Sequence, residues 1–111
     1  MRVVIARDTG LSGEEFADLV FRWGTRGKYE RRESLHMPSL EYFRADFFGF
    51  SAHVCYVDMT DAACTDYYFF VWGPGGNSEA IEDVMMSKAL DFLRKGGYRA
   101  DWDTLGGESV Q

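Results

Sequence analysis

Residues 11–24, LSGEEFADLVFRWG, restrict the possible folds of this chain more than any other segment. Ser12 and Glu15 have the spacing of a capping box, which begins a helix, and Gly24 is typical of the residue that ends one. Apolar side chains between them recur at i, i+3, i+4 and i+7, as Phe16, Leu19, Val20 and Trp23. A helix with one apolar stripe must bury it against a second layer, so the rest of the chain has to supply that layer.

Apolar and aromatic runs predict the strands of that layer. Residues 2–6, RVVIA, are typical of a buried strand in the middle of a sheet, and residues 50–57 and 67–72 predict an antiparallel hairpin. A short edge strand is expected near residues 33–37. Residues 39–49 fit both a helix and a strand, and we interpret them as a short helix that ends at Gly49.

A second long helix is predicted from Asn77 or Ser78 to Gly96. Its expected buried stripe comprises Ile81, Val84, Met85, Ala89 and Phe92. Residues 97–102 predict a last strand, which gives a single domain over residues 1–102 and a flexible tail over 103–111. The predicted fold is an α+β two-layer sandwich, in which a small, mainly antiparallel sheet carries two main helices on one face, in the order β-α-(β/α)-β-β-α.

Length and composition favour a single cytoplasmic domain. The chain has 111 residues, 46% of them hydrophobic, which is enough for one core. No apolar segment has the length of a membrane span, and a charge at Arg7 interrupts the first apolar run, so neither membrane association nor an export signal is expected. Cys55 and Cys64 are therefore expected to remain thiols.

The glycine-rich loop at residues 73–78, GPGGNS, has the position of a phosphate cradle between a strand and a helix. It lacks the lysine of a P-loop, and Ser78 stands where the third glycine of a dinucleotide fingerprint is required. Glu79, Glu82 and Asp83 lie in the first helical turns and would repel a phosphate. The loop is therefore interpreted as a structural turn.

Other chemistry is weakly indicated. His53, Cys55 and Cys64 lack the C-x-x-C spacing of a zinc site, and the nearby Asp58, Asp61 and Asp66 do not follow the order of a calcium loop. Two catalytic pairs are conceivable: Cys55 as a thiolate with His36 or His53, and Asp101 with Asp103 as an acid and a base. We instead interpret these side chains as ordinary core and surface residues. We expect a satisfied histidine, no catalytic residue, no metal and no cofactor, and thus a protein that is not an enzyme.

Charge separates the two halves of the chain. The net charge is −6; residues 1–44 hold 8 basic and 7 acidic residues, whereas residues 45–111 hold 4 and 11. Such a balance disfavours direct binding of nucleic acid and favours a protein partner with a basic surface. The predicted partner-binding surface is the acidic turn with the tyrosines that follow it: Asp58, Asp61, Asp66, Tyr67 and Tyr68.

These features predict a small acidic protein-interaction domain that acts as an inhibitor or regulator, with a homodimer left open. By analogy of composition, phages and mobile elements encode inhibitors of this character, including anti-CRISPR proteins, and immunity proteins share it. One alternative is a nucleic-acid-binding module that uses the basic and aromatic stretch of Arg22, Trp23, Arg26, Lys28, Tyr29, Arg31 and Arg32. The structural interpretation of that stretch is a solvated loop whose arginines pair with the acidic half of the same molecule or of a second copy. The other alternative is a small enzyme or small-ligand binder with a pocket among the sheet aromatics.

Overall fold

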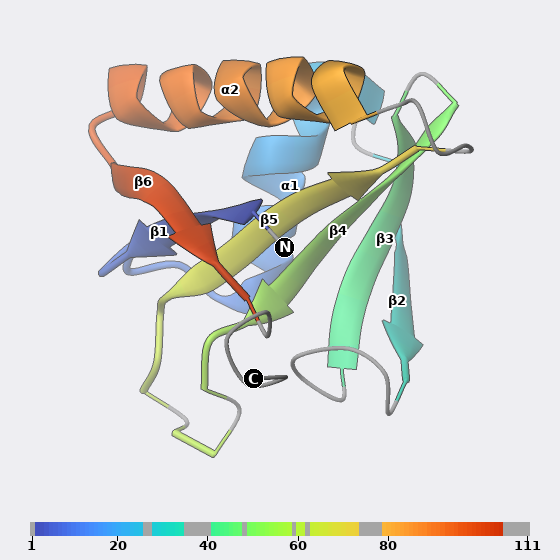
Figure 1. Ribbon diagram of the computed structural model, residues 1–111. Coiled ribbons are helices and arrows are strands. Elements are labelled where there is room, and N and C mark those ends of the chain that lie inside the picture. The colour runs from blue at the N-terminus through green and yellow to red at the C-terminus, as the bar shows by residue number, and fades with distance from the viewer. Residues whose placement is uncertain are drawn as a thin grey trace, which may run out of the picture.

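The predicted α+β class is confirmed by a six-stranded antiparallel sheet with two helices (Figure 1). The computed structural model of the chain describes residues 2–25, 28–34, 41–47, 49–58, 60–61, 63–73 and 79–105. In chain order, the elements are β1 (Arg2–Arg7), α1 (Gly13–Thr25), β2 (Glu30–Glu33), β3 (Glu41–Phe47), β4 (Phe50–Tyr56), β5 (Tyr67–Trp72), α2 (Glu79–Lys95) and β6 (Arg99–Thr104).

The strands lie in the order β2-β3-β4-β5-β1-β6, and every neighbouring pair is antiparallel. The predicted hairpin of β4 and β5 is confirmed, with Val54 opposite Phe69. β1 lies between β5 and β6, as expected for a buried strand. β6 continues two residues past the predicted end of the domain, because Asp103 and Thr104 pair with β1.

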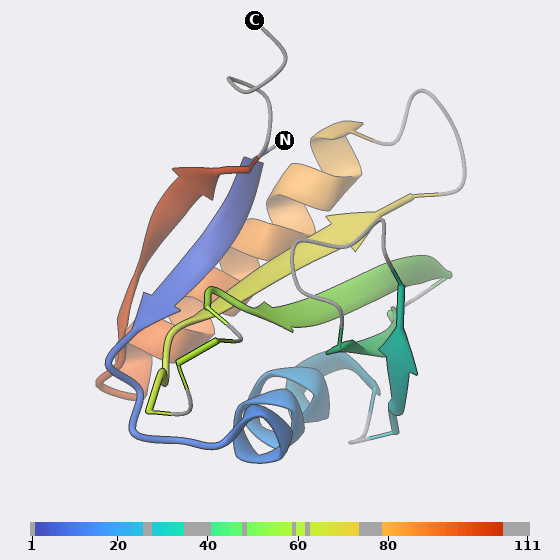
Figure 2. The same cartoon turned by 90° about the horizontal axis from the view of Figure 1, so that it is seen from below.

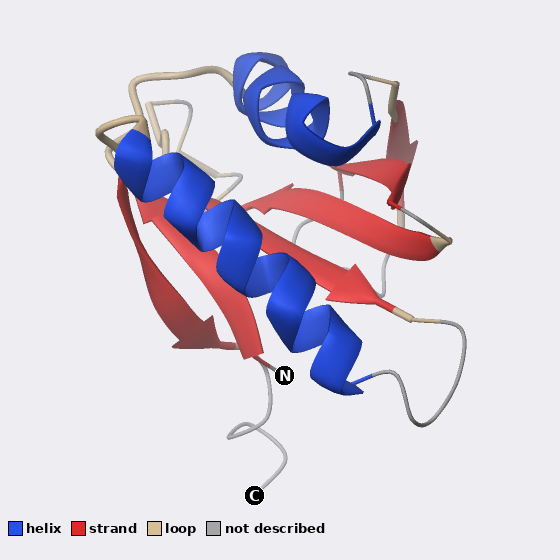
Figure 3. Cartoon of the chain, turned by 90° about the horizontal axis from the view of Figure 1, so that it is seen from above, coloured by secondary structure: helices blue, strands red, loops and turns tan. Residues whose placement is uncertain are grey.

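Both helices cover the same side of the sheet, as predicted (Figure 3). α1 packs on β3 and β4, and α2 packs on β6, β5 and β1. The Phe16 ring of α1 stacks on Tyr67 with the ring centroids 4.8 Å apart, and the Phe21 ring lies 6.4 Å from that of Phe69. Side chains on the other side of the sheet are also buried in the chain: Val3, Ile5, His53, Cys55 and Phe70.

α1 begins as the sequence predicts. The Ser12 N–H donates to Glu15 Oε1 at 2.8 Å, and the Glu15 N–H donates to Ser12 Oγ at 3.2 Å, which is the expected capping box. The prediction that Gly24 ends the helix is wrong, because α1 continues to Thr25. The buried stripe contains Phe21, which the predicted stripe omitted, and Leu19 is only half-buried.

α2 also lies where it was predicted, but its buried face differs. Ile81 and Val84 are 52% and 54% exposed, whereas the core contacts come from Met85, Met86, Ala89, Leu90 and Leu93. The helix is rotated relative to the predicted stripe because the sheet, rather than the helix alone, selects the buried side. Tyr98 N donates to Leu93 O and Gly97 N to Arg94 O, with Gly97 at a φ of 89°, so Gly97 ends the helix one residue after the predicted Gly96.

The prediction of a short helix over residues 39–49 is wrong. β3 pairs with β4 on one side and with β2 on the other, so its backbone hydrogen bonds go to neighbouring strands. The edge strand β2 ends at Glu33, where the predicted one began, and residues 35–40 lie outside the described residues. So do residues 74–78 of the glycine-rich loop and residues 106–111 of the predicted tail. Neither described helix is long and apolar enough to cross a membrane.

Candidate functional site

The acidic loop, residues 57–66, joins β4 to β5 and is fixed to the segment between β1 and α1. The N–H and the hydroxyl of Thr9 both donate to the carbonyl of Thr65, at 3.1 and 2.7 Å. The Val57 N–H donates to the Asp66 carbonyl at 3.2 Å, which closes the loop at its base. Figure 2 shows the yellow-green loop beside the blue segment that leads into α1. Two chain segments far apart in the sequence therefore form one surface.

Hydrogen bonds orient the three loop carboxylates. Asp58 Oδ1 accepts from the N–H and the hydroxyl of Thr60, at 2.9 and 2.6 Å, and these bonds hold the pKa of Asp58 below its ordinary value. Asp61 Oδ1 accepts from the Ala63 N–H at 2.9 Å, and Asp66 Oδ1 accepts from the Asp8 N–H at 2.7 Å. Each of the three carboxylates is thus oriented by at least one hydrogen bond.

The loop carboxylates have no cationic partner in the described part of the chain. The salt bridges there leave out Asp58, Asp61 and Asp66. Asp58 and Asp61 are exposed, and Asp66 is half-buried. Their negative charge is therefore balanced by hydrogen-bond donors alone, and two of the three face solvent.

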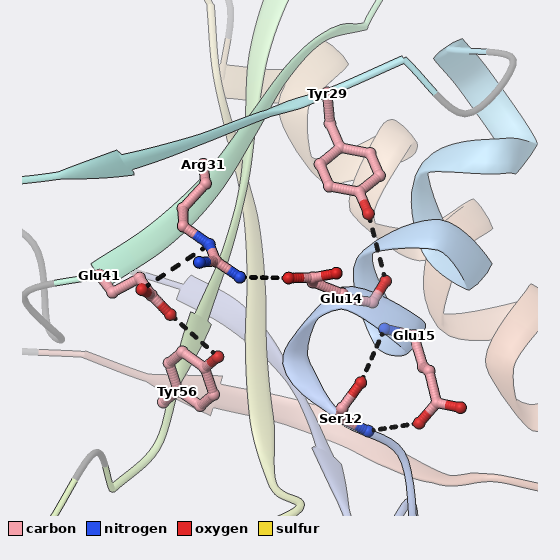
Figure 4. Close-up of polar contacts among 7 residues, drawn as sticks. All are labelled: Ser12, Glu14, Glu15, Tyr29, Arg31, Glu41 and Tyr56. Carbon is pink, nitrogen blue, oxygen red and sulfur yellow. Dashed lines mark hydrogen bonds and ion pairs between the residues drawn. The ribbon is translucent and has the colours of Figure 1, made fainter.

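More carboxylates lie next to the loop, around the start of α1 (Figure 4). Arg31 from β2 pairs with Glu14 of α1 and, at 3.7 Å, with Glu41 of β3. The Tyr56 hydroxyl donates to Glu41 at 3.1 Å. A hollow of about 300 Å³ separates the helix start from the loop. We name as the acidic end the carboxylates of the loop and of the segments around it: Asp8, Glu14, Glu15, Glu41, Asp58, Asp61 and Asp66.

The two tyrosines predicted to belong to this surface, Tyr67 and Tyr68, differ in burial and in the side of the sheet that they face. Tyr67 is 1% exposed, and its hydroxyl donates to the Leu11 carbonyl at 2.6 Å. Burial also raises the pKa of Tyr67 to about 12. Tyr68 is half-buried and points to the opposite side of the sheet, because neighbouring strand residues alternate. The sequence was therefore wrong to treat the Tyr67 ring as exposed: it is a core residue that fixes the start of α1.

Two arginines of the basic stretch that offered an alternative site, Arg31 and Arg32, pair with carboxylates of the same molecule. Besides the pairs of Arg31, Arg32 Nε lies 2.6 Å from Glu30 Oε2. These partners lie within the first 41 residues, so the prediction that these arginines pair with the acidic half of the chain is wrong. Tyr29 is half-buried, and its pKa is raised to about 12 by burial and by Asp18.

All four described basic residues of that stretch are exposed, and among the described residues Arg22 and Lys28 have no salt bridge. Arg26 and the Trp23 side chain lie outside the described residues.

His53 is more unusual than the sequence suggested. It is 3% exposed and lies among the rings of Tyr42, Phe70 and Trp72, with centroid distances of 5.8, 5.0 and 4.7 Å. Nε2 lies 3.3 Å from Ser51 Oγ, whereas the buried Nδ1 has no hydrogen-bond partner among the described residues. The expectation of a satisfied histidine is therefore wrong for Nδ1. Burial, with smaller contributions from the nearby Arg44 and Arg32, lowers the pKa of His53 to about 4, so this ring is neutral at pH 7.

The other residues that were considered for chemistry have structural partners. His53 and Cys55 share a sheet face, but among the described residues no group of three or more histidine, cysteine, aspartate or glutamate side chains could hold a metal ion. Asp101 pairs with Arg94 at 2.7 Å. The Gly73 N–H donates to Glu82 Oε2 at 2.6 Å, so a helix carboxylate already occupies a donor of the glycine loop. Both cysteines are free thiols.

Sequence reasoning missed the carboxylates that join the loop from elsewhere. Asp8 directly follows β1, Glu14 is the second residue of α1 and Glu41 is the first of β3, so each stands at or near the end of an element. This position could have indicated that these carboxylates lie near the loop, since the ends of the strands of a small sheet lie close together. Which ends meet depends on the strand order, which the sequence did not reveal.

Comparison of the chain with models of protein families, with curated proteins and with solved structures gives no match. The chemistry of the surface itself must therefore indicate the function.

Proposed function

We propose that this chain is a protein-binding domain whose acidic end docks on a basic surface of a partner protein. The observation that carries this proposal is the state of the loop carboxylates. Asp58, Asp61 and Asp66 are each oriented by hydrogen bonds, while the ion pairs of the described residues leave all three without a cation. Arginine or lysine side chains of a partner would supply the missing charge.

The attachment of the loop at its base favours binding. The Thr9 and Thr65 contacts and the bond from Asp8 to Asp66 hold the end of the loop that leads into β5 before any partner arrives. Less conformational entropy is then lost on association, which makes the same contacts worth more in affinity. Clustered negative charge also accelerates encounter with a basic partner at low salt.

A partner of this kind would often be a nucleic-acid-binding protein, because its basic site is built for phosphates. Occupation of that site would make the domain an inhibitor or regulator acting in the cytoplasm, of the class that phages and mobile elements encode. Direct binding of nucleic acid by this chain is less well supported, since Arg31 and Arg32 already pair with carboxylates of the same molecule.

Charge reversal at the loop tests the interface. In the variant Asp58→Lys/Asp61→Lys, both changed side chains are exposed, so thermal unfolding should change little. The matched control is Glu79→Lys/Asp91→Lys, which makes the same change in net charge at two exposed positions of α2. Each protein is immobilised and used to capture partners from the native host, and the recovered protein is then purified and its Kd measured.

The loop variant is expected to weaken binding of that purified protein at least tenfold, and the α2 control less than threefold. If both variants bind like the wild type, the acidic end is not the interface. If both lose binding equally, net charge rather than this surface governs association. A shift of labelled DNA or RNA by the wild-type protein alone, at physiological ionic strength, would instead favour the nucleic-acid-binding alternative.

A further inference from the structure

A second surface, separate from the acidic end, lies between α2 and the last strand. Trp102 of β6 points to the helix side of the sheet, since it stands opposite Val4. With Val84 and Leu90 of α2, it forms the apolar part of a hollow of about 520 Å³, whose other lining residues are polar: Asp83, Ser87, Lys88, Asp91 and Arg94. Val84 is 54% exposed, whereas the Arg2 guanidinium lies over the Trp102 ring, 3.9 Å from its centroid, so Val84 is the apolar side chain of the hollow that faces solvent. Figure 1 shows β6 beneath α2, at the end of the sheet.

β6 is also a sheet edge, because within the described residues it pairs with β1 alone. Arg94 Nε donates to the Ala100 carbonyl at 2.8 Å, which indicates that this carbonyl points away from β1. Residues two apart on a strand share this orientation, so Trp102 and Thr104 also turn their N–H and C=O groups outward. The Thr104 N–H is taken by Asp103 Oδ1 at 2.8 Å. Trp102 therefore offers both a donor and an acceptor at the edge.

We propose that this groove docks an extended segment of a partner protein, which adds to β6 as a further strand. Its backbone would bond to Trp102, and every second side chain would point into the hollow beside Val84, where an apolar residue fits. The remaining side chains would face Asp101 and Asp103 on the other side of the sheet. Asp101 already pairs with Arg94, whereas Asp103 has no salt bridge within the described residues, so lysine or arginine is favoured opposite Asp103.

Other occupants satisfy the edge less well. A docked helix would cover the Trp102 N–H and C=O without bonding to them, because its own backbone groups are already paired. A second copy of the chain would have to pair β6 with β6 about a two-fold axis. In such a dimer, Trp102 could pair with Ala100, Trp102 or Thr104 of the second copy. These three registers place Asp101 opposite Asp101, Asp101 opposite Asp103, and Asp103 opposite Asp103, respectively. Like charges on opposite strands are unfavourable in every case.

The probe is a synthetic nine-residue peptide of alternating valine and lysine, added to the ¹⁵N-labelled full chain. A peptide of the same composition, with its valines and lysines in two blocks, is the matched control for charge. With the alternating peptide, the Trp102 amide is expected to exchange at least tenfold more slowly, and the amide signals of β6 and α2 to shift. The block peptide should do neither, since it cannot present valine and lysine on opposite faces.

Two protein variants separate the groove from general electrostatics. Val84→Lys places a charge in the hollow and should weaken binding of the alternating peptide at least fivefold. Ile81→Lys makes the same change at an equally exposed position of α2 outside the hollow, and should alter binding less than twofold. Asp58→Lys/Asp61→Lys should leave Trp102 protection intact, so the acidic end and the groove can fail independently.

Three results would overturn the assignment. Equal protection by both peptides would show that charge alone drives binding, and shifts confined to residues 57–66 would place the peptide on the acidic loop. A concentration-dependent dimer that Val84→Lys dissociates would show that a second copy occupies the groove.

Discussion

Acidification should destabilise this protein through one residue, His53. Its ring is 3% exposed, and burial together with the positive charges of Arg44 and Arg32 lowers its pKa from 6.5 to about 4. Between these two pH values, the unfolded state binds a proton that the folded state does not. The stability that the neutral ring contributes is therefore fully present above pH 6.5 and is lost as the pH falls towards 4.

The size of this loss follows from the two pKa values. A difference of roughly 2.5 pKa units corresponds to about 3 kcal/mol, at 1.36 kcal/mol for each unit. Most of it, about 2 kcal/mol, should be lost between pH 7 and pH 4.5. At a urea m-value of about 2 kcal/mol/M, the unfolding midpoint would fall by ~1 M through His53 alone.

Urea unfolding of the wild type and of His53→Leu, at pH 7 and pH 4.5, isolates this contribution. The two proteins have every other ionisable group in common, so the difference between the two pH responses belongs to His53. The variant also removes the unpartnered Nδ1, and at pH 7 it should be at least as stable as the wild type. Equal pH responses of the two proteins, or an NMR titration that gives His53 a pKa near 6.5, would refute the burial of a neutral ring.

Two further variants test the packing that positions the acidic end. Gly13→Ala should lower the free energy of unfolding by about 1–3 kcal/mol in urea titrations, because a Cβ there would overlap the Tyr56 hydroxyl. Adding Tyr56→Phe removes that hydroxyl and should restore part of the lost stability. If the double variant is no more stable than Gly13→Ala, this contact is not the cause. Tyr67→Phe should cost about 1–2 kcal/mol, since the Leu11 carbonyl loses its 2.6 Å hydrogen bond; an unchanged melting temperature would show that this bond does not fix the start of α1.

The sequence correctly predicted the helices and strands that depend on contacts between residues a few positions apart in the chain. The capping box of Ser12 and Glu15 is a contact across three residues, and it forms as predicted. β1 and the hairpin of β4 and β5 follow from their apolar runs, because a run of this length leaves few ways to bury it. The two-layer arrangement then follows from amphipathic helices that need a sheet.

Where a sequence pattern fits both a helix and a strand, or more than one buried helix face, contacts with distant parts of the chain decide which forms. Residues 41–47 have apolar residues at helical spacing, yet they form β3 because β2 and β4 both pair with them. The apolar residues of α2 cover more than one side of the helix. The sheet buries Leu90 and leaves Val84 exposed, which opens the groove beside β6.

By itself, the sequence determined the composition of the acidic loop and the presence of a helix start beside a polar segment. Only the tertiary structure decided that Asp66 bonds to Asp8, that Arg31 joins Glu14 to Glu41, that the Tyr67 ring is buried, and that His53 is left with an unpartnered nitrogen. The physical reason is range. Capping and turn formation depend on residues a few positions apart, whereas these contacts depend on strand order and register, which the packing of the whole chain selects.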